Sequence, residues 1–105
     1  MTQKEIEAML DEIGVEYRYH HFEEDEAIAP PFLVYLIPES NNFSADGVVF
    51  FDADVLNLEL YTDYRDLNLE DQIEKVLNKH EIFWEKESVY IESEKMYETI
   101  YTMEV

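Results

Sequence analysis

Two adjacent histidines followed by a run of acids are the residues most suggestive of metal chemistry in this chain. His20 and His21 stand just before the segment Glu23-Glu24-Asp25-Glu26. Imidazole and carboxylate groups are common metal ligands. On a strand, however, neighbouring side chains point to opposite faces, so the two imidazoles would not reach one ion together. We therefore expect no metal site here.

No other set of residues selects a catalytic mechanism. A chain with 26 acids contains close carboxylate pairs by chance alone, and no motif selects two of them as the catalytic pair of a glycoside hydrolase. Gly14 and Gly47 are the two glycines of the chain, which rules out a glycine-rich phosphate loop. The acids at 52 and 54 lack the rest of a calcium-binding loop. No nucleophile-elbow motif surrounds the serines, which are Ser40, Ser44, Ser88 and Ser93. We expect a protein that is not an enzyme and that uses no metal or cofactor.

The composition indicates one globular domain, residues 1–105. Apolar residues make up 47% of the chain and aromatic residues 14%, which is too rich for a disordered protein. The chain has no cysteine, which fits a reducing compartment. No stretch is apolar enough to cross a membrane, and the polar N-terminus does not resemble a signal peptide. We expect the protein in the cytosol.

The charge balance limits the partners of the protein. Aspartate and glutamate total 26 against 7 lysines and arginines, a formal net charge of −19. Such a charge repels nucleic-acid phosphates and anionic membrane surfaces. The simplest interpretation is a well-solvated surface. Two sharper ones are a surface that DNA passes without adhering, and a surface that imitates DNA.

Two segments have the apolar periodicity of amphipathic helices. In Thr2–Ile13, Thr2 and Glu5 match a capping box, and Gly14 is suited to a left-handed turn after the helix. In Leu69–His80, Asn68 is the expected N-cap, and Asp71 and Lys75 have the spacing of an ion pair. The apolar stripes of the two segments are Ile6, Met9, Leu10 and Ile13, and Leu69, Ile73, Val76, Leu77 and His80.

The remaining segments have the composition and alternation of strands. The clearest is Val55–Thr62, where Leu56, Leu58 and Leu60 alternate with polar or aromatic residues. The unbroken apolar run Phe32–Ile37 predicts an interior strand with both faces covered. The full set of expected strands is Val15–Phe22, Phe32–Ile37, Val48–Phe51, Val55–Thr62, Ile82–Trp84, Val89–Glu92 and Met96–Val105. The expected hairpin turn before the last strand is Glu92-Ser93-Glu94-Lys95. In that strand, Tyr97, Thr99, Tyr101 and Met103 alternate with Glu98, Ile100, Thr102 and Glu104. We predict an α+β fold, with two helices packed on one face of a mainly antiparallel β-sheet.

A polar segment from Pro38 to Gly47 is predicted to be a loop, because it is dense in turn residues. Phe43 is unusual in it as a large apolar side chain. It could anchor the loop on the domain's own core or contact a neighbouring subunit.

Several quoted segments together resemble a family of small phage and prophage proteins of Gram-positive bacteria. These segments are Tyr-His-His-Phe (19–22), Pro-Pro-Phe-Leu-Val-Tyr-Leu (30–36), Ser-Asn-Asn-Phe-Ser-Ala-Asp-Gly (40–47), Leu-Glu-Leu-Tyr-Thr-Asp (58–63) and Tyr-Ile-Glu-Ser-Glu-Lys-Met-Tyr-Glu (90–98). The resemblance covers nearly the whole chain. It is to proteins encoded among the head–tail and tail genes of long-tailed phages, which are similar to tail-terminator (tail-completion) proteins.

This resemblance implies a virion structural protein that works as a ring. The ring, expected to be a hexamer, would cap the tail tube and join it to the head, with tail-tube and head-completion proteins as partners. Its expected location is the host cytoplasm during assembly and then the virion. Neither direct nucleic-acid binding nor membrane binding is expected. The candidate subunit-interface residues are Asn41, Asn42, Phe43, Ser44, Asp46 and Tyr101.

The alternative function is an acidic DNA mimic that inhibits a DNA-binding enzyme, such as a restriction enzyme. It requires carboxylates spaced like phosphates along an elongated face. Its binding would weaken at high salt, because salt screens such contacts.

Overall fold

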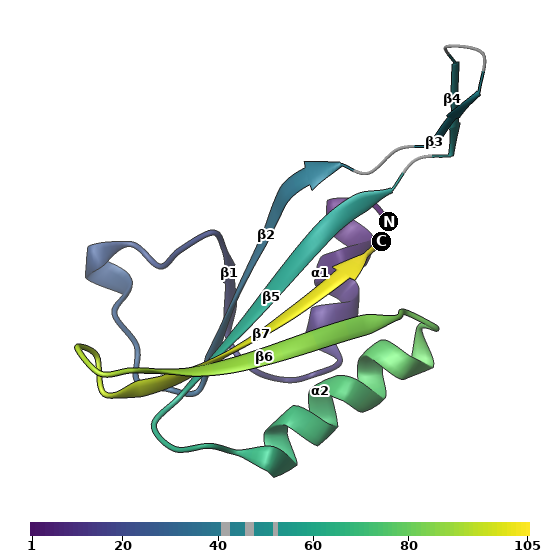
Figure 1. Ribbon diagram of the computed structural model, residues 1–105. Coiled ribbons are helices and arrows are strands. Elements are labelled where there is room, and N and C mark those ends of the chain that lie inside the picture. The colour runs from purple at the N-terminus through teal and green to yellow at the C-terminus, as the bar shows by residue number, and fades with distance from the viewer. Residues whose placement is uncertain (41–42, 46–47, 52) are drawn as a thin grey trace.

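A computed structural model describes residues 1–40, 43–45, 48–51 and 53–105, and for 43–45 and 48–51 it describes the backbone alone. Figure 1 shows the two helices, the five-stranded sheet and a separate two-stranded ribbon. The elements in chain order are α1 (Gln3–Asp11), β1 (Tyr17–Tyr19), the 3₁₀ turn η1 (Glu24–Glu26), β2 (Phe32–Ser40), β3 (Phe43–Ala45), β4 (Val48–Phe51), β5 (Asp54–Thr62), α2 (Leu67–Lys79), β6 (Trp84–Ile91) and β7 (Met96–Glu104).

The main sheet has the strand order β1-β2-β5-β7-β6. The β2–β5, β5–β7 and β6–β7 pairs are antiparallel, and the short β1 pairs with β2 in parallel. Strand β5 therefore lies at the centre, with β1 and β6 at the two edges. The predicted α+β class with a mainly antiparallel sheet is confirmed.

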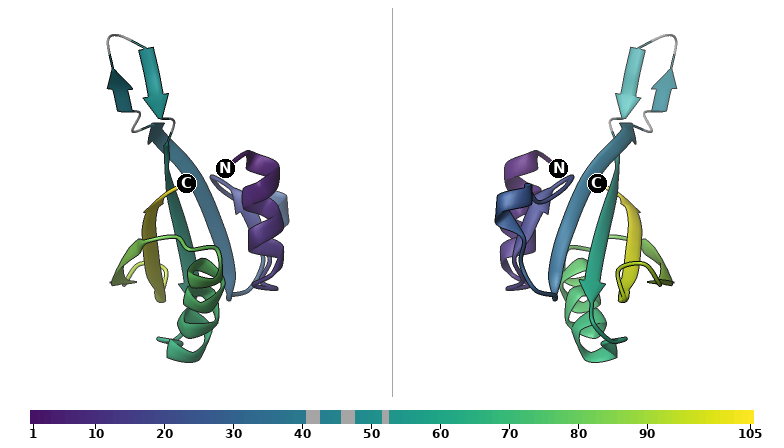
Figure 2. Two further views of the ribbon diagram at one scale, coloured as in Figure 1. Left: turned by 90° about the vertical axis from the view of Figure 1, so that its right-hand side faces the viewer. Right: turned by 90° about the vertical axis from the view of Figure 1, so that its left-hand side faces the viewer.

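The core lies between the sheet and both helices, which cover the same face (Figure 2, left). On β5 the alternation is as predicted, because Leu56, Leu58 and Leu60 are fully buried. The other buried core residues come from α1 and the turn after it, from α2, and from β2 and β7, the strands on either side of β5. They are Ile6, Met9, Leu10, Ile13, Leu33, Tyr35, Ile73, Leu77, Tyr101 and Met103. Within the described residues, neither α1 nor α2 lies on the other face of the sheet, which is called here the helix-free face.

The N-terminus of α1 has the predicted capping box. The Glu5 amide donates to Thr2 Oγ1 at 3.1 Å, and the Thr2 amide donates to Glu5 Oε1 at 2.9 Å. Each side chain thus satisfies a backbone N–H that the helix leaves free. Gly14 has φ +82°, the left-handed conformation predicted after this helix.

The second helix begins earlier than its apolar periodicity predicts. Its N-cap is Asp66, whose carboxylate accepts a hydrogen bond from the Leu69 amide at 3.0 Å, and Asn68 lies inside the helix. An aspartate and an asparagine two residues apart are both good caps, so the pattern did not separate them. The predicted ion pair between Lys75 and Asp71 is present at 3.0 Å.

The first predicted strand is much shorter than expected. It comprises only Tyr17–Tyr19, because His20 adopts a left-handed backbone conformation (φ 69°) that ends the pairing with β2. The chain then crosses the helix-free face of the sheet through η1 before it enters β2 (Figure 2, right).

The prediction of a polar loop over Pro38–Gly47 is wrong for residues 38–40 and 43–45, which lie in strands, while positions 41, 42, 46 and 47 lie outside the described residues. Strand β2 continues through Pro38 to Ser40, with a shift in its register against β5 between Leu36 and Glu39. Such an irregularity accommodates a proline that cannot donate to the ladder. Strands β3 and β4 pair with each other in a second sheet, separate from the sheet that contains β2 and β5.

The C-terminal hairpin is longer than predicted. Strand β6 runs without interruption from Trp84 to Ile91, and a turn at 92–95 joins it to β7 as expected. The pairing places Trp84, Lys86 and Ser88 of β6 opposite Met103, Tyr101 and Thr99 of β7, on the helix-covered face. The alternation predicted for β7 is therefore correct.

Candidate interaction surface

A hairpin formed by β3 and β4, called here the arm, projects from one end of the molecule. It stands away from both helices and from the five-stranded sheet (Figures 1 and 2). In its register Phe43 pairs with Phe51, Ser44 with Val49 and Ala45 with Val48. A two-stranded ribbon has no interior of its own and is marginally stable in water. This composition makes the arm the candidate surface for a contact with another apolar surface.

The candidate interface residues are distributed in three ways. Phe43 and Ser44 belong to strand β3 of the arm. Asn41, Asn42 and Asp46 lie outside the described residues. Tyr101 lies in the core.

Tyr101 is a correction to the sequence-based interface. It is fully buried, and its hydroxyl donates to Glu74 Oε2 at 2.7 Å. Its ring packs edge-on against Trp84, with the ring centroids 5.6 Å apart. A side chain enclosed by its own domain is not a surface for another subunit. Aromatic alternation on β7 indicated a strand but could not distinguish its two faces.

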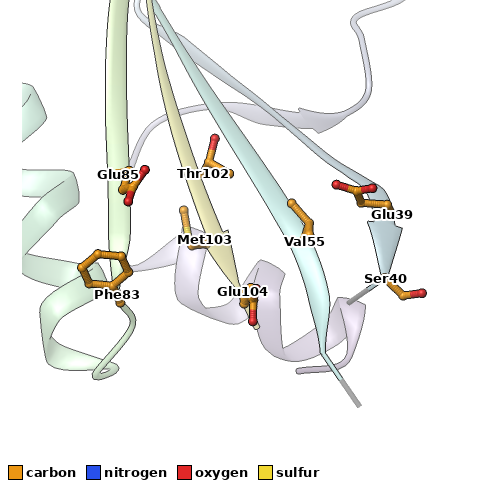
Figure 3. A pocket seen from close by; sticks show the side chains of 8 residues that line it. All are labelled: Glu39, Ser40, Val55, Phe83, Glu85, Thr102, Met103 and Glu104. Carbon is orange, nitrogen blue, oxygen red and sulfur yellow. The ribbon is translucent and has the colours of Figure 1, made fainter. Parts of the chain in front are cut away.

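A shallow hollow of about 670 Å³ lies beside the base of the arm (Figure 3). Carboxylates of Glu39, Glu85 and Glu104 come to it from three different strands, and Val55 and Thr102 lie between them. Phe83 lies at its side with 80% of its surface exposed. Within residues 1–40 and 53–105, no group of histidine or acidic side chains is arranged to hold a metal ion.

An apolar groove of about 760 Å³ lies at the opposite end of the helix-free face. Its floor is a row of aromatic rings in which Phe22 meets Phe32 edge-on at 5.1 Å and Phe32 stacks on Tyr61 at 5.0 Å. The segment before β2 forms its wall and exposes Ile28. The residues that line this groove are His20, His21, Phe22, Glu23, Glu24, Ala27, Ile28, Pro30, Phe32, Val34, Tyr61, Glu94 and Met96.

The two histidines do not diverge as a strand would place them. Because His20 has a left-handed backbone, its Nδ1 lies 3.0 Å from Nδ1 of His21. The other ring nitrogen of His21 lies 3.1 Å from a carboxylate oxygen of Glu23. The expectation that the two imidazoles point to opposite faces of a strand is therefore wrong. In the described part of the chain, neither histidine belongs to a group of side chains that could hold a metal ion.

A buried carboxylate in α2 is the residue that the sequence analysis missed most clearly. Glu70 is 1% exposed and accepts hydrogen bonds from Arg65 Nε at 2.6 Å and Lys86 Nζ at 3.1 Å. Lys86 also contacts Glu74 at 2.6 Å. Burial alone raises the pKa of Glu70, but the bonds from Arg65 and Lys86 outweigh it and hold that pKa below the usual range. The available signal was the i, i+3, i+7 spacing of Glu70 with Ile73 and Leu77, which places an acid on the apolar stripe.

A second carboxylate, Glu59, lies on the helix-free face next to a tyrosine. The Tyr61 hydroxyl oxygen is 2.5 Å from Glu98 Oε2 and 3.0 Å from Glu59 Oε1. A hydroxyl has one proton, so both contacts are full hydrogen bonds only when one carboxyl is protonated. Burial raises the pKa of Glu59, and the nearby charge of Glu98 adds to the rise.

Replacing Glu59 by Gln is expected to leave the protein at least as stable as the wild type at pH 7. A raised folded-state pKa means that Glu59 lowers stability as pH rises above its unfolded value, and the neutral amide removes that loss. Urea denaturation at several pH values measures the effect. The difference should disappear at pH values below the ordinary range of glutamate. The exposed Glu87→Gln on the same face is the control, and an E59Q protein less stable at pH 7 would contradict the assignment.

Comparison with known proteins identifies no relative: no family model matches the chain, and neither a curated protein nor a solved structure matches it significantly. In the described ranges, no helix is long and apolar enough to cross a membrane.

Proposed function

We propose that this protein is a phage structural protein of the tail-terminator (tail-completion) class. It assembles into a ring, with six copies as the expected number, that caps the tail tube and joins it to the head. Its partners are further copies of itself and the tail-tube and head-completion proteins. It acts in the host cytoplasm during assembly and then in the virion. The observation that carries the proposal is the apolar arm on an otherwise acidic domain.

The arm supports an assembly role because it stands away from both helices and from the five-stranded sheet. It leaves the five-stranded sheet between the end of β2 and the beginning of β5, and its two strands form a separate sheet. A projecting apolar segment usually marks a surface that another protein or subunit covers. A contact between unlike surfaces of identical subunits produces a ring when its rotation closes.

The charge supports the same role. With a net charge of −19, the chain offers little cationic surface on which passing DNA could adhere. Five of its lysines and arginines are already paired with acids: Arg18 with Glu16 and Glu26, Arg65 with Glu70, Lys75 with Asp71, Lys79 with Glu12, and Lys86 with Glu70 and Glu74. A ring of such subunits would repel the phosphate backbone rather than retain it.

The arm also favours assembly over DNA mimicry. A mimic needs carboxylates over its contact surface, whereas residues 40–51 contain one acid, Asp46. A mimic also has no use for a projecting apolar hairpin. Binding to a DNA-binding enzyme that is strong at low salt and lost at high salt would support the mimic instead.

Replacing Phe43 by Asp is the direct test of the proposal. We expect the variant to stay folded as a monomer while self-association and binding to tail tubes fall at least tenfold, because a charge replaces an apolar contact in the arm. Circular dichroism measures folding, and sedimentation velocity measures the mass of the protein alone and with tail tubes. The milder Phe43→Ala should have an intermediate effect.

The matched control is Tyr64→Asp, which changes another aromatic side chain, 66% exposed and far from the arm in the chain. It should assemble like the wild type. An unfolded F43D monomer would make Phe43 an anchor of its own domain. A wild-type protein that stays monomeric at high concentration and ignores tail tubes would overturn the proposal.

A further inference from the structure

Two consecutive stretches of this acidic chain are almost free of charge. Residues 27–38 contain no Asp, Glu, Lys or Arg, and residues 40–51 contain one. The first stretch supplies Ala27, Ile28, Pro30, Phe32 and Val34 to the groove. The second contains both strands of the arm. The arm and the part of the groove formed by residues 27–34 therefore carry little charge, while Glu23, Glu24 and Glu94 also line the groove.

These two surfaces cannot meet within one molecule. The groove lies where β2 begins and β5 ends, and the arm begins where β2 ends, at the other end of the same strand pair (Figure 1). The molecule extends 49 Å along its longest axis. An apolar projection at one end and an apolar recess at the other suit a head-to-tail contact between copies.

We propose that the arm of one copy docks in the groove of the next copy. The aromatic floor of Phe22, Phe32 and Tyr61 receives the apolar strands of the arm, and Ile28 borders the contact. Every copy then gives one arm and receives one, which is the heterologous repeat that a ring needs. This contact deepens the proposed function, because it names the surface that accepts the arm. It rests on the proposed function in one respect, which is that the protein must self-associate.

Salt should strengthen this contact rather than weaken it. Each copy carries a net charge of −19, so approach of a second copy is opposed by long-range repulsion. Salt screens that repulsion over a Debye length of about 8 Å at physiological ionic strength. Burial of apolar surface between arm and groove is not weakened by such screening. Association through ion pairs would show the opposite salt dependence.

The chain has no cysteine, so introduced thiols report on single positions. We would mix Ser44→Cys, in the arm, with Ile28→Cys, at the groove, and add a short bismaleimide at high salt. Cross-linked dimers should form in the mixture at least tenfold faster than in either variant alone. The control mixture pairs S44C with Lys75→Cys, whose side chain is 77% exposed on α2. A second variant, Ile28→Asp, should weaken self-association tenfold or more in sedimentation while keeping its circular dichroism spectrum.

Equal cross-linking of S44C with the groove and control cysteines would overturn the docking inference, as would unchanged association of I28D or association that weakens with salt. The proposed function fails separately. A protein that joins tail tubes without arm-to-groove cross-linking keeps the function and loses the inference. Cross-linked oligomers that ignore tail tubes keep the inference and lose the function.

Discussion

Removing both cations that contact Glu70 should lower the free energy of unfolding by about 3 kcal/mol. In the double variant Arg65→Ala/Lys86→Ala, Glu70 would remain buried without a positive partner, and such a loss typically costs 3–5 kcal/mol. We expect a loss at the lower end of this range, because the side chains of Arg65 and Lys86 are 40% and 30% exposed. Solvent therefore already screens part of their attraction to Glu70. Chemical denaturation at pH 7 measures the loss.

The pH dependence of this loss follows from the pKa of Glu70. That pKa is held below the usual range, so the ion pairs stabilise the fold above the ordinary pKa of glutamate. Their contribution is lost as pH falls through the lowered value. The difference between the double variant and the wild type should therefore be full at neutral pH and shrink in acid.

Two controls separate the buried charge from a general loss of side chains. The triple variant R65A/K86A with Glu70→Leu should recover most of the stability, because a leucine fills the buried site without a charge. Lys75→Ala removes an exposed pair with Asp71 and should cost only a few tenths of a kcal/mol. A double variant as stable as the wild type would show that water reaches Glu70.

The sequence predicted the elements whose signals are local. The capping box of Thr2 and Glu5 depends on residues three apart, and the structure has both of its hydrogen bonds. The alternation in β5 reflects one buried face, so it identified the buried leucines. The turn at 92–95 between two aromatic strands was also found. These features are decided by neighbours in the chain rather than by tertiary contacts.

Tertiary contacts decided what the sequence did not predict. Pro38 is a common loop residue, but pairing of β2 with β5 on both sides of a register shift keeps it within a strand. Glu70 resembles a favourable first-turn acid, and its burial is tolerable because Lys86 from β6 joins the neighbouring Arg65 in pairing with it. The groove combines segments from residues 20–34, β5 and the β6–β7 turn, so no continuous motif could reveal it.

Deleting the arm should abolish self-association and leave the domain folded. Ser40 and Asp54 are register partners in the β2–β5 pair, so an Asn-Gly dipeptide can replace residues 41–53 as a two-residue turn. Shortening the connection from thirteen residues to two lowers the entropic free-energy cost of closing the loop by about 1.5 kcal/mol, because each doubling of loop length costs ~0.6 kcal/mol. Loss of the buried Ala53 offsets part of this gain. We expect the free energy of unfolding to change by less than about 1.5 kcal/mol.

The deletion variant is most informative when mixed with the wild type, because it keeps the groove but gives no arm. If arm and groove are the two halves of one contact, each deleted subunit accepts one neighbour and ends the chain of contacts. Sedimentation of mixtures should then show shorter oligomers as the fraction of the variant rises, while the variant alone stays monomeric. Oligomers of unchanged size would place the subunit contact elsewhere on the domain. Combining the deletion with Ile28→Asp should remove this effect on the wild type, because that subunit neither gives an arm nor accepts one.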